Sequence, residues 1–541
     1  MVYNMKTVKA ITLDGQSVKY IHDTNNIQLW PYGQADQYFY FESIENGTQI
    51  GVQSHTTGSQ VTARFWISND KTNWTEWGYN SFPVQTINIG EKLYIWNKEN
   101  TMTNVQFTTS KNVKTGGNIM SLLNWREDLY ANCFYRLFRY TKITTTPTLP
   151  ATTLANNCYD SMFSNCTSLT TAPILPATTL AYGCYQNMFI DCTNLTTAPI
   201  LPATTLAYGC YGWMFAGCTS LVGAPALPAT TLAEHCYDSM FRACTSLTTA
   251  PVILPATILV PYCYISMFHG CTSLTAAPEL SATTLARYCC QQMFYSCTSL
   301  TAAPELRATT LAQYCYWEMF YNCTSLTTVP TILPATTLAY DCYAGMFEGC
   351  TSLRTAPSLP ATTLVGSCYA GMFEGCTSLR TAPSLPATTL ASSCYDSMFE
   401  GCASLRTAPS LPATTLTQYC YRNMFKGCTS LTTAPALSVT TLTIGCYQGM
   451  FYRCTSLTTA PVLPATLLEY KCYDNMFWGC TNLNYVKAMF TTDISSITDY
   501  TLDWLLGVAE NGTFVKNINA TWIRRDSSGI PTGWTIQTVN P

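Results

Sequence analysis

Apolar and polar residues follow one another along this chain in a pattern that repeats many times. The phrase CTSLTTAPILPATTLAYGCYQNMFID, residues 166–191, recurs in close copies through most of the sequence. Its marker, Cys-Tyr-x-x-Met-Phe-x-x-Cys, first begins at Cys158 and occurs thirteen times in steps of 26 residues, or 27 twice. A fixed period of this length predicts an elongated array in which each unit buries its apolar side against the next.

Within one repeat, apolar pairs return every four residues and alternate with variable pairs. This spacing predicts a helix of about ten residues with Cys184, Met188 and Cys192 along one stripe. Residues 168–172 predict a short strand that ends at Pro173, which has no N–H for a continuing ladder. Parallel strands stacked about 4.8 Å apart would make thirteen copies into a solenoid roughly 60 Å long.

The segments on either side of the array have other patterns. Two short apolar runs around Asp14 and Gly15 predict a hairpin, and about seven β-branched and aromatic runs after it predict an antiparallel β-sandwich. A degenerate repeat, CFYRLFRYT, precedes the array, and a predicted helix, TLDWLLGVA, with two strand-like runs, GTFVKN and GWTIQT, follows it. The expected parts are an attachment hairpin (1–33), a β-sandwich (34–119), a linker with an N-terminal cap repeat (120–157), the repeat solenoid (158–483) and a C-terminal cap (484–541).

The recurring phrase MFxxCTSLTTAPxLPATTLA, over residues 131 to about 490, resembles the BspA-like leucine-rich repeats of surface proteins of gut Bacteroides and of proteins of their phages. With the patterns above, the resemblance implies a β-rich chain with α/β repeats, in which an N-terminal β-sandwich precedes a leucine-rich-repeat solenoid with terminal caps. It implies adhesion or recognition and supplies no catalytic residue. Cys290 in place of tyrosine and Ala403 in place of threonine are local departures from the pattern.

Charge and composition argue against several classes of function. Only 11% of the residues are charged and the formal net charge is −3, so we expect neither nucleic-acid binding nor attraction to an anionic membrane. No apolar stretch approaches the roughly 20 residues of a membrane helix. The opening residues, MVYNMKTVKAITLDG, lack the apolar block of a secretion signal, which favours folding in a reducing cytosol.

The 28 cysteines are expected to be buried thiols. Within one predicted helix the two cysteines of a repeat would lie about 12 Å apart, too far for a disulfide. Bonds between neighbouring repeats and zinc binding stay open as less favoured alternatives.

Charged side chains also recur with the repeat. Glutamates 348, 374 and 400 share one repeat position, and arginines 354, 380 and 406 share another. A bound cation is one interpretation of the carboxylates. The simpler one is recent duplication, since AGMFEGCTSLRTAPSLPATTL occurs twice without change, with nearby arginines to neutralise the row. We predict no metal, no cofactor and no catalytic residue, since the four histidines occur in unrelated contexts.

The pairs that flank Cys-Tyr and Met-Phe change from copy to copy while the marker itself is kept. These variable positions are rich in aromatic residues and are expected on one exposed face, where Tyr and Trp suit sugar stacking or protein interfaces. Relaxed surface variation is the competing explanation. The candidate ligand-binding residues are Tyr182, Tyr208, Trp213, Tyr288, Tyr295, Trp317, Tyr321, Tyr340 and Trp478.

These observations predict a non-enzymatic recognition protein. The favoured setting is a phage virion, as a tail or head fibre assembled in the host cytoplasm that binds a bacterial surface glycan or protein through its repeats. Its N-terminal region would contact other virion proteins, and homo-oligomers are compatible with the sequence. The alternatives are a bacterial cell-surface adhesin, a purely structural virion spacer and a polysaccharide-degrading enzyme, for which the sequence offers no carboxylate pair.

Overall fold

The structure, a computed structural model, describes residues 37–540 except 57–58, 79–81, 127 and 496–498, together with four short strands before residue 37. These strands form two antiparallel pairs, β1 (Thr12–Leu13) with β2 (Gln16–Ser17) and β3 (Ile21–His22) with β4 (Gln28–Trp30). The hairpin turn predicted at Asp14 and Gly15 lies outside the described residues. The chain forms two compact units, Met1–Pro228 and Ala229–Pro541.

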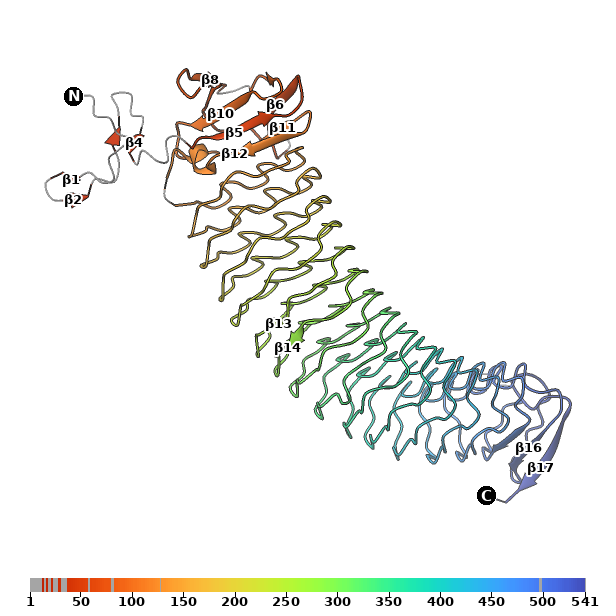
Figure 1. Ribbon diagram of the computed structural model, residues 1–541. Coiled ribbons are helices and arrows are strands. Elements are labelled where there is room, and N and C mark those ends of the chain that lie inside the picture. The colour runs from red at the N-terminus through yellow and green to blue at the C-terminus, as the bar shows by residue number, and fades with distance from the viewer. Residues whose placement is uncertain are drawn as a thin grey trace. The chain divides into compact units, whose positions relative to one another are not determined.

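The first unit contains a two-sheet antiparallel β-sandwich (Figure 1). One sheet has the strand order β12-β5-β10-β7-β8 and the other β11-β6-β9. The seven predicted strands are confirmed as β5 to β11, and VKTG forms an eighth, β12, that was not predicted. The bounds are β5 Phe39–Ser43, β6 Thr48–Ser54, β7 Phe65–Ser68, β8 Thr75–Trp77, β9 Gln85–Ile87, β10 Lys92–Asn97, β11 Val105–Thr109 and β12 Val113–Gly116.

Aromatic side chains fill the space between the two sheets and continue into the first coils. Phe107 on β11 lies 5.3 Å from Phe41 on β5 and 5.8 Å from Phe65 on β7, measured between ring centroids. The same ring stacks on Phe138 of the degenerate repeat at 5.7 Å, and Phe138 stacks on Phe163 at 5.5 Å. A short 3-10 helix, η2 (Ile119–Leu123), joins the sandwich to the coils. The sandwich therefore supplies the apolar surface on which the first coil packs.

The marker segment of each repeat folds into consecutive turns, so the predicted helix is wrong. In the repeat that begins at Cys158, alternate backbone N–H groups close turns of four residues, as Met162 N does by donating to Tyr159 O over 3.2 Å. The N–H groups between them donate to the next coil; Tyr159 N, for example, donates to Cys184 O over 3.0 Å. Every backbone donor of residues 157–166 is thus paired, half within the coil and half between coils.

A left-handed backbone at every fourth position makes this turn chain possible. In one coil Gly183, Asn187 and Asp191 have φ angles of 54°, 54° and 58°. They stand directly before the first cysteine, the methionine and the second cysteine of the marker. Left-handed backbone favours Gly, and then Asn and Asp, because other side chains clash with the carbonyl oxygen.

The predicted strand of each repeat contracts to single parallel bridges. Thr171 pairs with Thr197 in this way. Among the described repeats, the one two-residue pair, β13 (Ile253–Leu254) with β14 (Glu279–Leu280), lies after the proline at which the predicted strand ends. Threonine hydroxyl groups add a second link between coils, as Thr196 Oγ1 does by donating to Thr170 O over 3.3 Å. The coils are therefore joined by backbone hydrogen bonds between their turns and by side-chain bonds rather than by a continuous sheet.

Cys, Tyr, Met and Phe of the marker form inward columns whose side chains are at most 2% exposed. In the second unit the phenyl rings from Phe241 to Phe477 stack in one column, with centroids 5.4–5.8 Å apart from coil to coil. Cys290 interrupts the parallel tyrosine column, yet its N–H still donates to Cys315 O over 3.0 Å. The substitution therefore changes the packing and keeps the coil.

All 28 cysteines are free, buried thiols. The second cysteine of a repeat donates from its Sγ to the phenylalanine carbonyl of the preceding coil, as Cys376 does to Phe347 O over 3.1 Å. Burial raises the pKa of the Cys184 thiol to about 12. Because the thiolate is the reactive species, these sulfur atoms are chemically protected in the folded chain.

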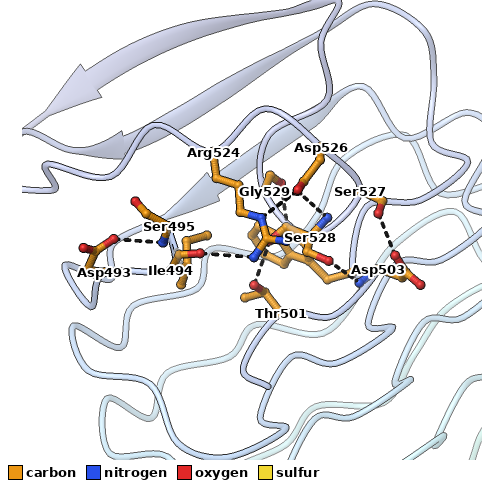
Figure 2. Close-up of polar contacts among 11 residues, drawn as sticks. Asp493, Ile494, Ser495, Thr501, Asp503, Arg524, Asp526, Ser527, Ser528 and Gly529 are labelled. Atoms are coloured by element: carbon orange, nitrogen blue, oxygen red, sulfur yellow. Dashed lines mark hydrogen bonds and ion pairs between the residues drawn. The ribbon is translucent and has the colours of Figure 1, made fainter. Parts of the chain in front are cut away.

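The second unit ends in a three-stranded parallel sheet, β15 (Tyr485–Ala488), β16 (Gly512–Asn517) and β17 (Trp534–Val539). The predicted strands GTFVKN and GWTIQT are confirmed by β16 and β17, whereas the helix predicted over residues 501–509 is wrong, since these residues form turns. Figure 2 shows how residues 524–529 close over these turns: Thr501 Oγ1 donates to Ser528 O over 2.8 Å, and Ser527 Oγ to Asp503 Oδ1 over 2.6 Å. The cap thereby supplies the last coil with the hydrogen-bond partners that another repeat would otherwise supply.

Among the described residues, no helix has the length and apolar character needed to cross a bilayer.

Candidate binding surface on the turn face

The variable residues of the repeats project from the turn segments in three outer columns, which we call the turn face. The first outer column holds the residue one or two positions before the first cysteine, such as Tyr288. The middle outer column follows the Cys-Tyr pair, as at Trp317, and the last outer column follows the Met-Phe pair, as at Tyr321. Their side chains are exposed or half-buried, except where the position holds a small residue or an acid that is ion-paired or hydrogen-bonded, as at Asp396 and Asp474.

Aromatic rings in the last outer column stack directly on one another. Tyr295 lies 4.5 Å from His269 and 4.4 Å from Tyr321, with ring planes within 10° of parallel. Farther along the same unit Tyr452 and Trp478 stack at 4.5 Å and 8°. The coil-to-coil register therefore brings three of the predicted residues, Tyr295, Tyr321 and Trp478, into two stacks of parallel rings. We call such a stack a ladder.

The first outer column forms ladders of the same kind. In the first unit Tyr182 and Tyr208 stack at 5.0 Å and 4°, and these side chains are 48% and 42% exposed. In the second unit Tyr288 stacks on Tyr262 at 5.1 Å and on Tyr314 at 4.7 Å. Each ladder buries ring faces against neighbouring rings, so it presents ring edges and hydroxyl groups to solvent. The flat stacking surface expected for a sugar is therefore covered inside a ladder.

Two further predicted residues make edge-on ring contacts in the second unit. Trp317 and Tyr340 meet Tyr314 edge-on, at 5.9 Å and 5.7 Å. Tyr340 is 45% exposed, and its ring lies against Gly366, where an added Cβ would come within 3.0 Å of it. Trp213 is half-buried at a left-handed position with φ 57°. Within the second unit, ring contacts join Tyr288, Trp317 and Tyr340 through Tyr314, and the two ladders of the last outer column hold Tyr295, Tyr321 and Trp478.

The sequence analysis missed three members of the ladders. His235 stacks on Tyr262 at 4.6 Å, His269 stacks on Tyr295, and Tyr314 links the first outer column to Trp317. The histidines were set aside because their neighbours in the sequence differ. Their distance from Tyr262 and Tyr295, one repeat length, was the signal that places them in the same columns.

Carboxylates occupy the last outer column between the two ladders of the second unit. The pKa of Glu348 is raised to about 7, first by burial and then by repulsion from Glu374 and Glu318, while a hydrogen bond from Tyr321 lowers it. The pKa of Glu374 is also raised to about 7, by burial first and then by Glu400. A Cβ on Gly371 would lie 3.4 Å from Glu374 Oε2 and 3.7 Å from Glu348 Oε2, so both carboxylates lie above this glycine.

The neutralisation of this row by arginines was a wrong prediction. Arg354 and Arg380 are exposed on another part of the coil, and the ion pairs of the described residues include none between them and the glutamates. Instead Lys426 pairs with Glu400 over 2.8 Å at the end of the row. Within the described part of the chain, no group of three or more His, Cys, Asp or Glu side chains has a geometry that could hold a metal ion.

Comparison with solved structures finds several leucine-rich-repeat proteins of gut bacteria. One from Bacteroides ovatus is 14% identical, covers 90% of this chain and 100% of its own, and has a TM-score of 0.41. A leucine-rich cell surface protein from Faecalibacterium prausnitzii is 16% identical, covers 81% and 94%, and has a TM-score of 0.30. One from Eubacterium ventriosum is 14% identical, covers 69% and 91%, and has a TM-score of 0.30.

No curated protein sequence matches the chain. The family model of the BspA-type leucine-rich-repeat region, with six copies, matches residues 101–222, 230–354, 266–405 and 367–504. These matches cover well over half of the sequence and include the degenerate first repeat, all thirteen copies of the marker and the beginning of the C-terminal cap. The chain therefore belongs to the BspA-type leucine-rich-repeat family.

Proposed function

We propose that this chain is a non-enzymatic recognition protein that binds a bacterial surface glycan or protein through its turn face. The observation that carries the proposal is the contrast between inward and outward positions of the same turns. The inward Cys, Tyr, Met and Phe recur almost unchanged, while the last outer column of the second unit changes chemistry from coil to coil. In order it reads Arg242, His269, Tyr295, Tyr321, Glu348, Glu374, Glu400, Lys426, Tyr452 and Trp478.

The stacking of the rings defines what such a surface offers to a ligand. Within a ladder the rings expose edges and, at tyrosine, hydroxyl groups that donate and accept hydrogen bonds. The coil backbone holds these groups in place, because half of its turn amides bond to the next coil. A rigid row of hydroxyl groups and apolar edges suits a partner that combines hydroxyl groups with apolar patches, and it loses little conformational entropy on binding.

The setting that we propose is a virion, as a tail or head fibre. Its support is the state of the sulfur atoms, since 28 buried free thiols suit folding in a reducing cytosol, where virions assemble. The N-terminal strands and sandwich would then contact other virion proteins. A bacterial cell-surface adhesin of the same family is the second setting. Detection of the protein in purified phage particles would support the first setting, and its detection in washed cell envelopes of uninfected bacteria would support the second.

Binding of the purified, reduced protein to intact gut Bacteroides cells, with and without their capsule, tests the recognition function. We expect Tyr321→Ala, which removes the end of one ladder, to weaken binding. Ile174→Ala is the matched control, because this side chain is 83% exposed on a different part of the coil. Binding by neither cell type would instead favour a structural spacer. Release of sugars from the capsule by the purified protein would contradict the non-enzymatic proposal.

A further inference from the structure

The turn face of the second unit is hollowed between three neighbouring coils near its C-terminal end. The hollow has a volume of about 390 Å³ and is lined by Arg422, Asn423, Lys426, Gln448, Tyr452 and Asn475. Its floor is Gly449, at φ 62°, where an added Cβ would come within 2.3 Å of Asn423 Oδ1. Glycine at this position therefore keeps the hollow open.

Ion pairs with the neighbouring coil hold the two cations of the hollow in place. Arg422 Nε lies 3.0 Å and 3.1 Å from the two oxygens of Asp396, and Arg422 Nη2 also contacts this carboxylate. Lys426 Nζ lies 2.8 Å from Glu400 Oε1. Each positive charge is thus balanced by a carboxylate, while N–H groups of Arg422 and Lys426 beyond these bonds stay available as donors.

One carboxylate also orients the amides on the other side of the hollow. Asp474 accepts hydrogen bonds from Gln448 Nε2 and from Asn475 Nδ2, both over 3.0 Å. Because the amide nitrogens are engaged in this way, the carbonyl oxygens of Gln448 and Asn475 are the acceptors that these side chains offer to a ligand. The hollow consequently presents fixed donors on one side and fixed acceptors on the other.

The Tyr452–Trp478 ladder forms an aromatic border beside these polar groups. Lys426 Nζ lies 5.6 Å from the centroid of the Tyr452 ring, and the Arg453 guanidinium lies 4.9 Å from that of Trp478. These cations restrict the movement of the rings. The border adds an apolar edge and the Tyr452 hydroxyl group to the polar side chains that line the hollow.

We propose that this hollow binds an uncharged, hydroxyl-rich glycan segment, an inference that rests on the recognition function proposed above. A sugar hydroxyl donates and accepts at once, which matches donors and acceptors held side by side, and sugar C–H groups match the aromatic border. The balanced charges give no net attraction to an acidic polymer. A protein interface is less well matched, because the cores of such interfaces are depleted of charged residues.

The test is binding of the purified full-length protein to immobilised neutral polysaccharides (mannan, dextran and galactan) and to anionic alginate, alongside binding to encapsulated Bacteroides cells. We expect binding to at least one neutral polysaccharide, with little change when the salt is raised to about 0.5 M, since no net charge is involved. Gln448→Ala and Tyr452→Phe, which remove one amide or one hydroxyl group, should each weaken binding about tenfold. Tyr452→Phe retains the ring stack, so its effect cannot come from misfolding of the coil.

Matched controls lie outside the hollow. Gln186→Ala removes the amide at the same repeat position as Gln448 in another coil, and Tyr94→Phe removes one tyrosine hydroxyl group on β10 of the sandwich; both should bind neutral polysaccharide like the wild type. Binding to alginate alone, binding abolished by salt, or equal loss in the controls would overturn the glycan assignment. If cells are bound as well by Gln448→Ala and Tyr452→Phe as by the wild type, the hollow is not the site while the recognition function stands. If the wild type binds no cells, the recognition function itself fails.

Discussion

The paired glutamates above Gly371 make the stability of the second unit depend on pH. The pKa of Glu374 is raised from 4.5 to about 7, and Glu348 is raised to the same value. A carboxyl group whose folded pKa is raised binds its proton more tightly in the folded chain than in the unfolded chain. Well below pH 4.5 the glutamates are protonated in both the folded and the unfolded chain, so they do not make stability depend on pH there. Between pH 4.5 and 7 the unfolded chain gives up its protons first, so stability falls as pH rises.

The magnitude follows from the size of the shift. One pKa unit corresponds to about 1.4 kcal/mol, which would give about 3 kcal/mol for a fully buried group. Because both glutamates are half-buried, solvent screening reduces this to about 1–2 kcal/mol each. Glu374→Gln has no charge at any pH and also relieves the repulsion on Glu348. We therefore expect it to stabilise the surrounding coils by about 1–2 kcal/mol at pH 8 and to leave them unchanged at pH 4.

Hydrogen exchange measured by mass spectrometry on peptides from residues 340–400 reports the local free energy of opening and avoids assuming a single unfolding step for a repeat array. Rates are corrected for the intrinsic dependence of exchange on pH. Glu305→Gln, at an exposed position, is the control and should have no effect. The reasoning is refuted if the wild type and Glu374→Gln show the same change between pH 4 and pH 8, or if the wild type becomes more stable as pH rises through this range.

Three further predictions concern the coil itself. Phe373→Ala removes a fully buried ring that stacks on Phe347 and Phe399 at 5.8 Å and 5.7 Å, and should lower stability by about 3–5 kcal/mol in urea unfolding; a loss under 1 kcal/mol would contradict its place in the core. Iodoacetamide should label few of the 28 thiols in the native protein and all of them in urea, because burial holds thiols such as Cys184 at a pKa of about 12; rapid native labelling would show that the columns are open. Ala243→Gly should raise stability by about 1 kcal/mol, since Ala243 has φ 58°, whereas Ala207→Gly, outside the left-handed positions, should lower it. A lower unfolding temperature for Ala243→Gly, or a higher one for Ala207→Gly, would refute the turn geometry.

The repeat architecture could be predicted from the sequence because its signals are long and redundant. Thirteen copies of one marker indicate stacking, and the alternation in FYFES or KLYIWN predicts strands that the structure contains as β5 and β10. The inward positions of Met188 and Phe189 were likewise predictable, since a residue kept in every copy is what stacking requires. Both side chains are fully buried.

The local conformation of the turns could not be predicted from apolar spacing alone. Over ten residues, a period of four resembles the helical period of 3.6, although after eight residues a helix has turned about 80° past the starting direction. The distinguishing signal was the residue before each marker position. Gly183, Asn187 and Asp191 are poor choices for the interior of a helix and good ones for left-handed turns. The spacing of apolar residues alone does not reveal this second period, the recurrence of Gly, Asn or Asp at every fourth position.

The chemistry of the turn face was predictable in kind but not in geometry. Aromatic residues at variable positions indicated an exposed face, yet only the register between coils shows that rings such as Tyr295 and Tyr321 cover each other. The hollow at Gly449 depends on ion pairs between different coils. Asp396 and Arg422 are 26 residues apart and occupy the same position of adjacent repeats, so their pairing follows once the stacking is known.

The bonding scheme of the turns also makes the length of the array adjustable. Each coil receives from one neighbour the same set of backbone bonds that it gives to the other, and residues 344–364 are identical to residues 370–390. An in-frame loss of residues 365–390 would join Leu364 to Ala391 and leave each remaining coil with neighbours of the usual kind. Such a deletion would shorten the array by about 4.8 Å and remove one carboxylate from the glutamate row. Reach and surface chemistry can thus change together, in whole-coil steps, while the coil-to-coil contacts stay of one type.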